Sequence, residues 1–396
     1  MTQIIDQLAS EMHRRFGTVS GDVQVVRSPY RICPLGAHID HQHGPVTAMA
    51  IDQAAHLAFA PSGDSQVRLA SLTFEGTVAF DLRAVPDKTG SDWGNYARGA
   101  VRALQAAGHV LSRGIVGVTS GSMNEGGLSS SAAIGLAFLL ALENANGLTL
   151  SAEQNVRLDQ AIENGYIGLK NGILDPSAIL FSRRNHLTVI DCATATHALI
   201  AKSPALPPFD ILIAQSGLKE ALIGTGYNTR VEECRQAASI LLNAAGREEQ
   251  DSILGNVTAD EYRQHGHRLS GAIARRAEHF FSEAGRVHRG VDAWQSGDLC
   301  EFGRLISQSG YSSIHNYECG SQPLIDLYHI LIATEGVYGA RFSGAGFRGC
   351  CVALVDPLKS AAALDHVRVR YQQKHSDLAR KTASFTCQPD GGARIL

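Results

Sequence analysis

Hydrophobic positions recur at helical spacing in residues 1–17, MTQIIDQLASEMHRRFG, where two acidic residues interrupt the apolar pattern. This arrangement predicts an amphipathic helix and argues against a signal peptide. Residues 67–74 and 77–82 alternate between apolar and polar side chains. That alternation predicts two strands, with Glu75 and Gly76 at the turn between them.

Prolines and capping residues define further elements of the first half. Pro29 and Pro34 argue against regular structure, so we expect most of residues 28–52 to form a loop. Ser151 and Gln154 have the spacing of a capping box, which predicts the start of a helix. The remaining elements expected here are strands at 23–27, 114–120 and 186–191 and helices at 93–107 and about 151–166.

A glycine-bearing loop, three serines and a helix follow one another in residues 121–146, GSMNEGGLSSSAAIGLAFLLALENAN. The apolar run 132–142 is too short to cross a membrane and predicts a buried helix that stops at Gly147. We expect the serine hydroxyls to cap this helix, and Gly126 and Gly127 to let the backbone approach a phosphate. A capped core helix after a flexible loop is the alternative, and these residues alone do not decide between the two.

A change of composition at residues 203–208, SPALPP, indicates a domain boundary at or shortly before this segment. The domains expected are therefore 1–200 and 201–396. Long helices dominate the second half. One is expected at about 228–246, and another opens with a capping box and spans about 258–284. Two shorter helices follow.

Residues 338–356 contain a GxGxxG pattern, formed by Gly344, Gly346 and Gly349. A dinucleotide-binding site would require a helix directly after this pattern and an acidic residue about 20 residues further on. Residues 350–355 instead have the character of a strand. We therefore expect two strands joined by a glycine-rich turn and reject the dinucleotide-binding interpretation.

The composition narrows the function classes. Hydrophobic residues make up 44% and charged residues 18% of the 396 residues, as in ordinary globular proteins. A formal net charge of −3 gives no indication of nucleic acid binding, and no apolar run is long enough for a membrane span. The eight cysteines show no CxxC spacing, so we expect reduced thiols in a cytoplasmic protein.

The expected loop at 28–52 is unusually polar. Its ionisable side chains lie close together in the sequence: Arg31, His38, Asp40, His41 and His43. Three histidines near an aspartate are compatible with a metal site, but their spacing matches no zinc pattern. We therefore expect these residues to form hydrogen bonds to a polar ligand.

Three separated segments resemble the motifs of one enzyme family. PYRICPLGAHID at 29–40 resembles the sugar-binding signature of galactokinases. EGGLSSSAA at 125–133 resembles the phosphate-binding motif of the GHMP kinase superfamily, and FSGAGFRGCCVALV at 342–355 resembles its third motif. The segment from Glu163 to Asp175 is similar to the galactokinase segment in which a metal-binding glutamate precedes a catalytic aspartate.

The resemblance is closer to the galacturonokinase branch of this family, through SPYRICPLGAHIDHQ at 28–42, the sequence around Glu163, SGAGFRGCC and NYECG at 316–320. It implies an α+β, two-lobed fold. An N-terminal lobe of the ribosomal-S5-like type (1–200) would bind sugar and ATP. A ferredoxin-like C-terminal lobe with extra helices (201–396) would close the active-site cleft.

The same resemblance implies a sugar 1-kinase that uses ATP and Mg²⁺ to phosphorylate the anomeric hydroxyl of D-galacturonate. Its partners would be a small sugar acid and ATP, with no nucleic acid and no membrane. A galactokinase, or a kinase of another pyranose such as arabinose or a hexosamine, is one alternative. A non-catalytic sugar sensor is another.

The family's site residues can be carried over position by position. Asp175 would accept the C1 hydroxyl proton, and Arg31 would hold Asp175 ionised and neutralise charge on the transferring group. Ser131, with Ser130 as a further candidate, and Glu163 would bind Mg²⁺. Positions that match sugar contacts are Ala37, His38, Asp40, Gly172 and Tyr227. Positions expected at the nucleotide are Gly126, Gly127, Leu128, Ser129, Ser130, Ser131 and Trp93.

Two positions depart from the galactokinase pattern. Pro176 follows Asp175 where galactokinases usually have glutamine, and an Asp–Pro pair suits an N-cap and the first helical residue. A plain helix cap is therefore the alternative for Asp175. Ala37 stands where galactokinases have the glutamate that binds the 6-hydroxyl, which favours galacturonate as the substrate. Lys219 and Arg230 are the candidates for a cation that binds its carboxylate.

Overall fold

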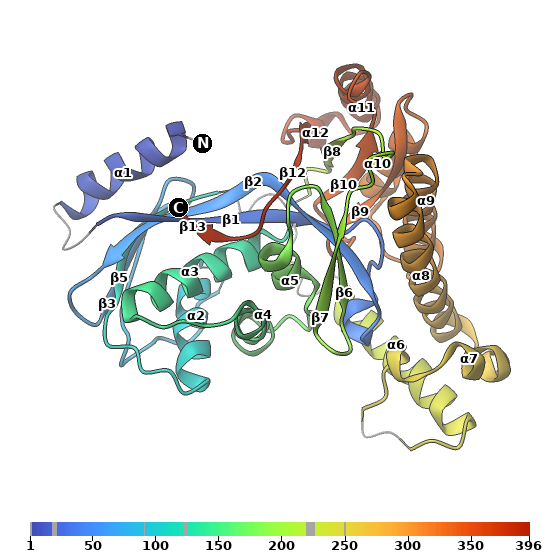
Figure 1. Cartoon of the computed structure of the whole chain (residues 1–396), viewed down its shortest axis with the longest axis horizontal. Coiled ribbons are helices and arrows are strands. Elements are labelled where there is room, and N and C mark those ends of the chain that lie inside the picture. Colours follow the sequence, from blue (N-terminus) through green and yellow to red (C-terminus); the bar gives the residue numbers. More distant parts are fainter. Residues whose placement is uncertain (1, 18–21, 91, 122–125, 219–225, 249–250) are drawn as a thin grey trace.

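The computed structural model describes residues 2–17, 22–90, 92–121, 126–218, 226–248 and 251–396. The described chain forms a nine-stranded and a four-stranded β-sheet, each packed against helices (Figure 1). Helices and mostly antiparallel strands alternate irregularly along the chain, as expected for the α+β class.

The larger sheet is built mainly from the first half of the chain. Its strands are β1 (Gln24–Ile32), β2 (Val46–Pro61), β3 (Gln66–Ser71), β4 (Thr77–Asp81), β5 (Ile115–Ser120), β6 (His186–Asp191), β7 (Thr196–Ala201), β12 (Pro389–Asp390) and β13 (Arg394–Ile395). The main path runs β13-β1-β2-β5-β3-β4, and β12 and β6 also pair with β2. Long β2 therefore connects most of this sheet.

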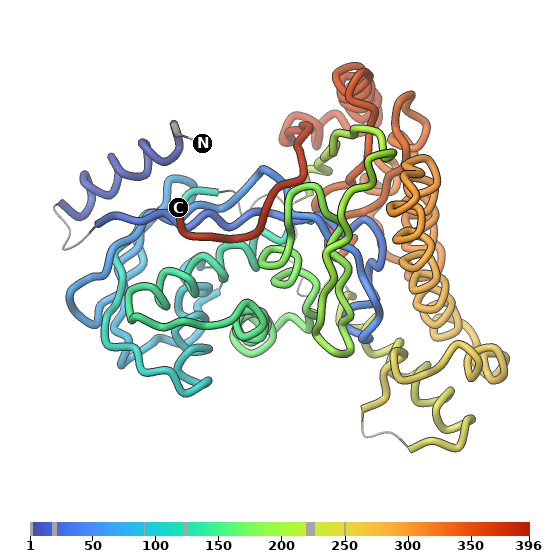
Figure 2. The backbone as a smooth tube through the Cα atoms, in the orientation of Figure 1, coloured from blue at the N-terminus to red at the C-terminus, as the bar shows by residue number. Residues whose placement is uncertain are grey.

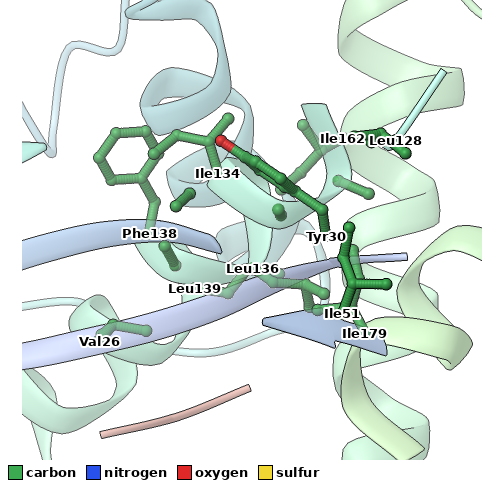
Figure 3. Close-up of a cluster of buried hydrophobic side chains, with 14 of the residues drawn as sticks. Val26, Tyr30, Ile51, Leu128, Ile134, Leu136, Phe138, Leu139, Ile162 and Ile179 are labelled. Atoms are coloured by element: carbon green, nitrogen blue, oxygen red, sulfur yellow. The ribbon is translucent and has the colours of Figure 1, made fainter. Parts of the chain in front are cut away.

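Successive side chains of β2 point to opposite faces of the larger sheet, and different helices cover these two faces. Leu57 and Phe59 point into the cluster formed with helix α3 (Ser130–Asn146), whereas Ala58 and Ala60 pack with helix α1 (Thr2–Phe16). Figure 3 shows the first cluster, in which Val26 of β1 lies near Phe138 of α3. The helices on the α3 side are α2 (Asn95–Ala106), α4 (Ala152–Ala161), a π-helical turn (Ile162–Ile167) and α5 (Leu174–Phe181).

The smaller sheet has the order β11-β8-β10-β9. Its strands are β8 (Asp210–Gln215), β9 (Val337–Ser343), β10 (Cys350–Val355) and β11 (Phe385–Cys387). The helices of this half are α6 (Tyr227–Ala244), α7 (Ala259–His265), α8 (Gly271–Ser296), α9 (Leu299–His315), α10 (Gln322–Ile332), α11 (Ser360–Lys374) and α12 (Ser376–Ala379). A second buried cluster joins this sheet to α6, α8 and α10.

The C-terminal residues return to the larger sheet. After β11 the chain crosses the molecule, and β12 and β13 pair with β2 and β1 (Figure 2). The expected boundary at residue 200 falls near the end of β7, one residue before this strand stops, and the next strand, β8, belongs to the other sheet. The exact division into 1–200 and 201–396 stays a prediction.

Local sequence signals correctly predicted several elements. Helix α1 and the capping boxes at Ser151 and Thr258 are present. The prediction of two strands in 338–356 is confirmed, because β9 and β10 are antiparallel neighbours. All eight cysteines lie in the described part of the chain, and none of them forms a disulfide there. In the described part of the chain, no helix is both long and apolar enough to cross a membrane.

The prediction that most of residues 28–52 form a loop is wrong at both ends. β1 continues through Pro29 to Ile32, and β2 begins at Val46. Pro29 is tolerated because β13 pairs with β1 only at Val26 and Arg27, and because the register of β1 shifts just after Pro29. The loop is therefore confined to residues 33–45.

The prediction of one helix over 258–284 is also wrong. Helix α7 ends at His265, a short 3₁₀ turn follows, and α8 starts only at Gly271. Gly266 has low helical propensity, and Gly271 has a φ of +57°, which a side chain would disfavour. These two glycines separate the helices.

Candidate active site

Arg31 and Asp175 form an ion pair between β1 and α5. The Nε atom of Arg31 donates to Oδ1 of Asp175 at 2.7 Å, and the Nη2 atom lies 2.7 Å from the same oxygen. The Nη1 atom donates to the carbonyl oxygen of Gly127 at 3.0 Å. The side chain of Arg31 is 3% exposed and that of Asp175 is 23% exposed, so solvent reaches the pair from the carboxylate side.

Asp175 does not cap helix α5. The helix begins at Leu174, and Ile173 occupies the N-cap position without a side-chain hydrogen bond. Asp175 therefore lies in the first turn, where Pro176 is tolerated because its missing N–H would have no helical partner. The interpretation of Asp175 as a plain cap is wrong, since its carboxylate is held by Arg31.

The glycine–serine loop at 126–131 packs against the turn between β9 and β10 through backbone atoms. A Cβ atom at Gly127 would lie 2.7 Å from the carbonyl oxygen of Ser343, and one at Gly126 would lie 3.0 Å from Cα of Gly349. The hydroxyl of Ser343 donates to the carbonyl oxygen of Gly127 at 2.6 Å. These glycines are needed because side chains would separate the loop from the turn.

The serines at the start of α3 have different surroundings. Ser129 has a φ of +56° and occupies the N-cap position, but its hydroxyl makes no capping hydrogen bond. Within the described residues, its buried Oγ atom has no hydrogen-bond partner. The prediction that the serine hydroxyls cap the helix is therefore wrong for Ser129. Ser131 lines the same cleft as Asp175 and contacts Glu163.

Two buried carboxyl groups lie one helical turn apart near Ser131. Glu163, in the π-helical turn, is 3% exposed, and Asp159 is 0% exposed. Among the described residues, Oε1 of Glu163 and both carboxyl oxygens of Asp159 lack hydrogen-bond partners. Burial raises the pKa of Glu163 to about 7, although the contact with Ser131 opposes this rise. Burial, and then the nearby Glu163, raise the pKa of Asp159 well above its usual value.

This donor set fits a magnesium ion that is held mainly by phosphate and water. An unpartnered carboxylate oxygen of Glu163 and the hydroxyl of Ser131 are hard oxygen ligands of the kind that Mg²⁺ prefers. Within the described ranges, no group of three or more histidine, cysteine, aspartate or glutamate side chains is placed to hold a metal. Sequence reasoning gave Asp159 no role, because its burial against Gly135 depends on helix packing.

The predicted sugar-contacting residues gather in one cleft with the ion pair. The cleft is lined by Arg31, Asp175, Ser129 and Ser131 and by all five predicted sugar positions: Ala37, His38, Asp40, Gly172 and Tyr227. A Cβ atom at Gly172 would lie 2.3 Å from Oδ2 of Asp40, so any side chain there would displace this carboxylate. Burial raises the pKa of Asp40 to about 6, with the nearby Asp175 as a second cause.

Of the three predicted histidines, His38 lines this cleft, whereas His41 and His43 line a neighbouring cavity. Burial holds the pKa of His38 well below its usual value and lowers that of His41 to about 3. His38 stacks on Tyr317 with a centroid separation of 4.4 Å, and His41 Nε2 lies 3.1 Å from the Tyr317 hydroxyl.

The turn at Ala37 is held by side chains of helix α8. A carboxylate oxygen of Glu283 accepts from the N–H groups of Gly36 at 2.8 Å and Ala37 at 3.3 Å, and His279 Nε2 lies 2.9 Å from the carbonyl oxygen of Ala37. Burial raises the pKa of Glu283, but Arg286 and further positive neighbours lower it overall, to about 2. No local pattern in the sequence indicates this network, because α8 follows Ala37 by more than two hundred residues.

The other predicted positions lie around or outside the cleft. Trp93 is buried beside Phe74, with ring centroids 6.4 Å apart, and the two rings line a small pocket with Ser130. Lys219 lies outside the described residues. Arg230 pairs with Glu233 at 3.3 Å and is not among the described residues that line the cleft.

Comparisons with known proteins agree on one family. The GHMP kinases N terminal domain matches residues 95–183, the GHMP kinases C terminal domain matches 291–372, and the galactokinase galactose-binding signature matches 12–61. The chain is 51% identical to a galacturonokinase from Arabidopsis thaliana over 96% of this chain and 95% of that protein. It is 31% identical to a galactokinase from Roseiflexus sp. (strain RS-1), over 94% and 93% of the two chains.

Comparison with solved structures supports the same family. The structure of Lactococcus lactis galactokinase complexed with galactose matches with a TM-score of 0.91 and 29% identity. The match covers 99% of this chain and 100% of that one. The predicted α+β, two-lobed fold is confirmed.

Proposed function

Because this chain belongs to the GHMP kinase family, in its galactokinase-like branch, we propose that it is a sugar 1-kinase for D-galacturonate. It would transfer the γ-phosphate of ATP to the anomeric hydroxyl and release galacturonate 1-phosphate and ADP. The observation that carries the proposal is the Arg31–Asp175 pair in the cleft lined by Ala37. The 51% identity to a relative named galacturonokinase supports this choice of sugar.

Asp175 would act as the general base. The C1 oxygen attacks the γ-phosphorus, its proton passes to a carboxylate oxygen of Asp175, and the bond to the bridging oxygen of ATP breaks with its electron pair leaving on ADP. Both Nε and Nη2 of Arg31 lie 2.7 Å from Oδ1, which leaves Oδ2 for the proton. The ion pair with Arg31 would hold the carboxylate in place during the transfer.

The glycine–serine loop would bind the phosphates. The backbone at Gly126, Gly127 and Leu128 approaches the third-motif turn without side chains in between, and α3 begins directly after Ser129. The partial positive charge at a helix N-terminus favours an anion. The buried, unpartnered hydroxyl of Ser129 adds a donor at the same place.

Ser131 and Glu163 would hold Mg²⁺, with Ser130 as a neighbouring hydroxyl. When bound, the ion would supply positive charge that offsets the negative charge of the phosphates. Glu163 is buried and has an unpartnered oxygen, which supports its role as the carboxylate ligand. Trp93 would lie near the adenine, since its pocket borders Ser130.

His38, Asp40, Gly172 and Tyr227 would position the sugar. Asp40 is a buried carboxylate beside a glycine that leaves room for it, as expected for an acceptor of sugar hydroxyls. Ala37 would leave space for the substrate's C6 carboxylate. A cytoplasmic location is also proposed, and it fits a described chain in which no disulfide links the cysteines.

An ADP-release assay over D-galacturonate, D-glucuronate, D-galactose and L-arabinose tests the proposal. We expect turnover to be highest with D-galacturonate, and we expect ³¹P NMR of the product to show a phosphate coupled to the anomeric proton. No turnover with any sugar would support the sensor alternative. Phosphorylation at another hydroxyl would contradict the assigned position of Asp175.

A further inference from the structure

Arg341 is a buried arginine without a carboxylate partner. The residue lies on β9 and is 1% exposed. Its Nη1 atom donates to the carbonyl oxygen of Cys33 at 3.1 Å, and its Nε atom has no partner among the described residues. Of the described carboxylates, none lies within salt-bridge distance of this guanidinium.

The other buried arginines are all paired. They are Arg27 with Asp390, Arg31 with Asp175, Arg98 with Asp92, Arg276 with Glu233 and Arg286 with Glu283. Burying a charge is costly unless hydrogen bonds and a counter-ion compensate for the lost water. Arg341 therefore lacks the direct carboxylate contact that every comparable arginine of the described chain has, and its charge acts on the buried Glu283 only from a longer distance.

The position of Arg341 on its strand directs it toward the cleft. Residues two apart on a strand share a face, so Arg341 lies on the same face of β9 as Ser343. The Ser343 hydroxyl lies 3.5 Å from Nη1 of Arg31 and donates to Gly127. Arg341 itself lines the cleft together with Ala37, as does Arg31.

Arg341 is also near the turn that carries Ala37. Its hydrogen bond reaches Cys33, four residues before Ala37. Its positive charge contributes, behind burial, to the lowered pKa of His279, whose ring binds the carbonyl oxygen of Ala37. Arg31 and Arg341 thus serve different parts of one cleft, with Arg31 bound to the proposed base and Arg341 close to the Ala37 turn.

We propose that Arg341 binds the C6 carboxylate of the substrate and determines the preference for a sugar acid. This inference rests on the proposed function. Of the described charged side chains that line the cleft, Arg31 is held by Asp175, and Asp40 and Asp175 are acidic. Among the described residues, Nε of Arg341 has no partner and no hydrogen bond engages Nη2, and these two donors form the edge of a guanidinium that binds a carboxylate bidentately. Ala37 leaves space for that carboxylate.

The test compares D-galacturonate with its neutral isostere, D-galacturonamide, and with D-galactose. We expect Arg341→Met to lower kcat/KM for D-galacturonate by about a hundredfold, chiefly through KM, because a charge-assisted bidentate contact is lost. Activity with the amide and with galactose should fall less than tenfold. Arg341→Lys should lie between the wild type and Arg341→Met. Arg304→Met is the matched control, since Arg304 is half-exposed, pairs with Glu301 and does not line the cleft. It should leave unchanged the ratio of kcat/KM for D-galacturonate to that for the amide (the acid-to-amide ratio).

Two results would overturn the inference. One is a ratio of kcat/KM for D-galacturonate to kcat/KM for D-galacturonamide that, in Arg341→Met, stays within threefold of the wild-type ratio. The other is an equal loss with all three sugars, which would mean a structural role. If Arg341→Met does not fold, the ratio measured for Arg341→Lys decides by the same criterion, since lysine keeps the charge and loses the planar fork. A wild type without activity on D-galacturonate would contradict the proposed function instead.

Discussion

Two nitrogen atoms of Arg31 lie 2.7 Å from the same carboxylate oxygen of Asp175, and one of them, Nε, donates a hydrogen bond to it. A carboxylate held through one oxygen keeps the other available for a proton. The third donor of Arg31 reaches the backbone of Gly127. The pair therefore connects the proposed base directly to the proposed phosphate-binding loop.

Replacing this base should remove turnover and spare the fold. In Asp175→Asn, the amide oxygen can still accept from Arg31, so the thermal midpoint should change by only a few degrees. The loss of general-base catalysis should lower kcat by about 10²–10⁴-fold. Asp87→Asn, at a fully exposed carboxylate, is the matched control. Near wild-type kcat in Asp175→Asn would mean that Asp175 has only a structural role.

Glu163→Gln should raise the Mg²⁺ concentration required for half-maximal activity by at least tenfold, because a neutral amide is a weaker ligand than a carboxylate. Binding of the sugar without nucleotide, measured by calorimetry, should be unchanged within twofold. Glu248→Gln, at an exposed position, serves as the control. An unaltered Mg²⁺ dependence would identify Glu163 as a buried helix residue without a metal role.

The raised pKa of Glu163 also makes a prediction about stability. Burial raises this pKa from 4.5 to about 7, so between these pH values the folded enzyme binds a proton that the unfolded chain has released. The resulting stabilisation is complete below pH 4.5 and is lost as the pH rises through about 7. In metal-free buffer, the free energy of unfolding of the wild type should therefore fall relative to that of Glu163→Gln, by about 1.4 kcal/mol per pH unit between pH 5 and 7. Parallel pH profiles of the two proteins would contradict the raised pKa.

Ala37→Glu should weaken binding of the sugar acid more than binding of the neutral sugar. Two like charges about 4 Å apart at an effective dielectric of about 20 repel by roughly 4 kcal/mol, which corresponds to about a thousandfold in affinity. Ala37→Gln adds similar volume without charge and is the matched control. Kinetics on D-galacturonate and D-galactose measure the effect. Equal losses in the Glu and Gln variants would attribute it to size alone.

Short-range sequence signals predicted the fold well. The capping boxes at Ser151 and Thr258 involve residues three apart, and both are present. Signals of this kind failed where distant strands or loops decide the local structure. Pro29 can lie within β1 because β13, one of the two strands beside β1, pairs with it only at Val26 and Arg27. The carboxylate of Asp175 binds Arg31, which lies 144 positions earlier in the sequence, and does not cap its own helix.

For the candidate site, too, the sequence indicated some residues and missed others. The motifs predicted correctly that Arg31, Asp40, Gly172 and Asp175 meet in one cleft. They gave no role to Arg341, although it lies directly before the third motif in the sequence. Its significance depends on the lack of a direct carboxylate contact among the described residues, and only the folded arrangement of distant strands and helices reveals this.

The central claim is that the wild-type enzyme phosphorylates a sugar acid. The most direct test is the ratio of kcat/KM for D-galacturonate to that for D-galactose, measured in one ADP-release assay with saturating ATP and Mg²⁺. We predict a ratio of about a hundred or more in favour of D-galacturonate. A ratio of one or less would contradict the substrate assignment.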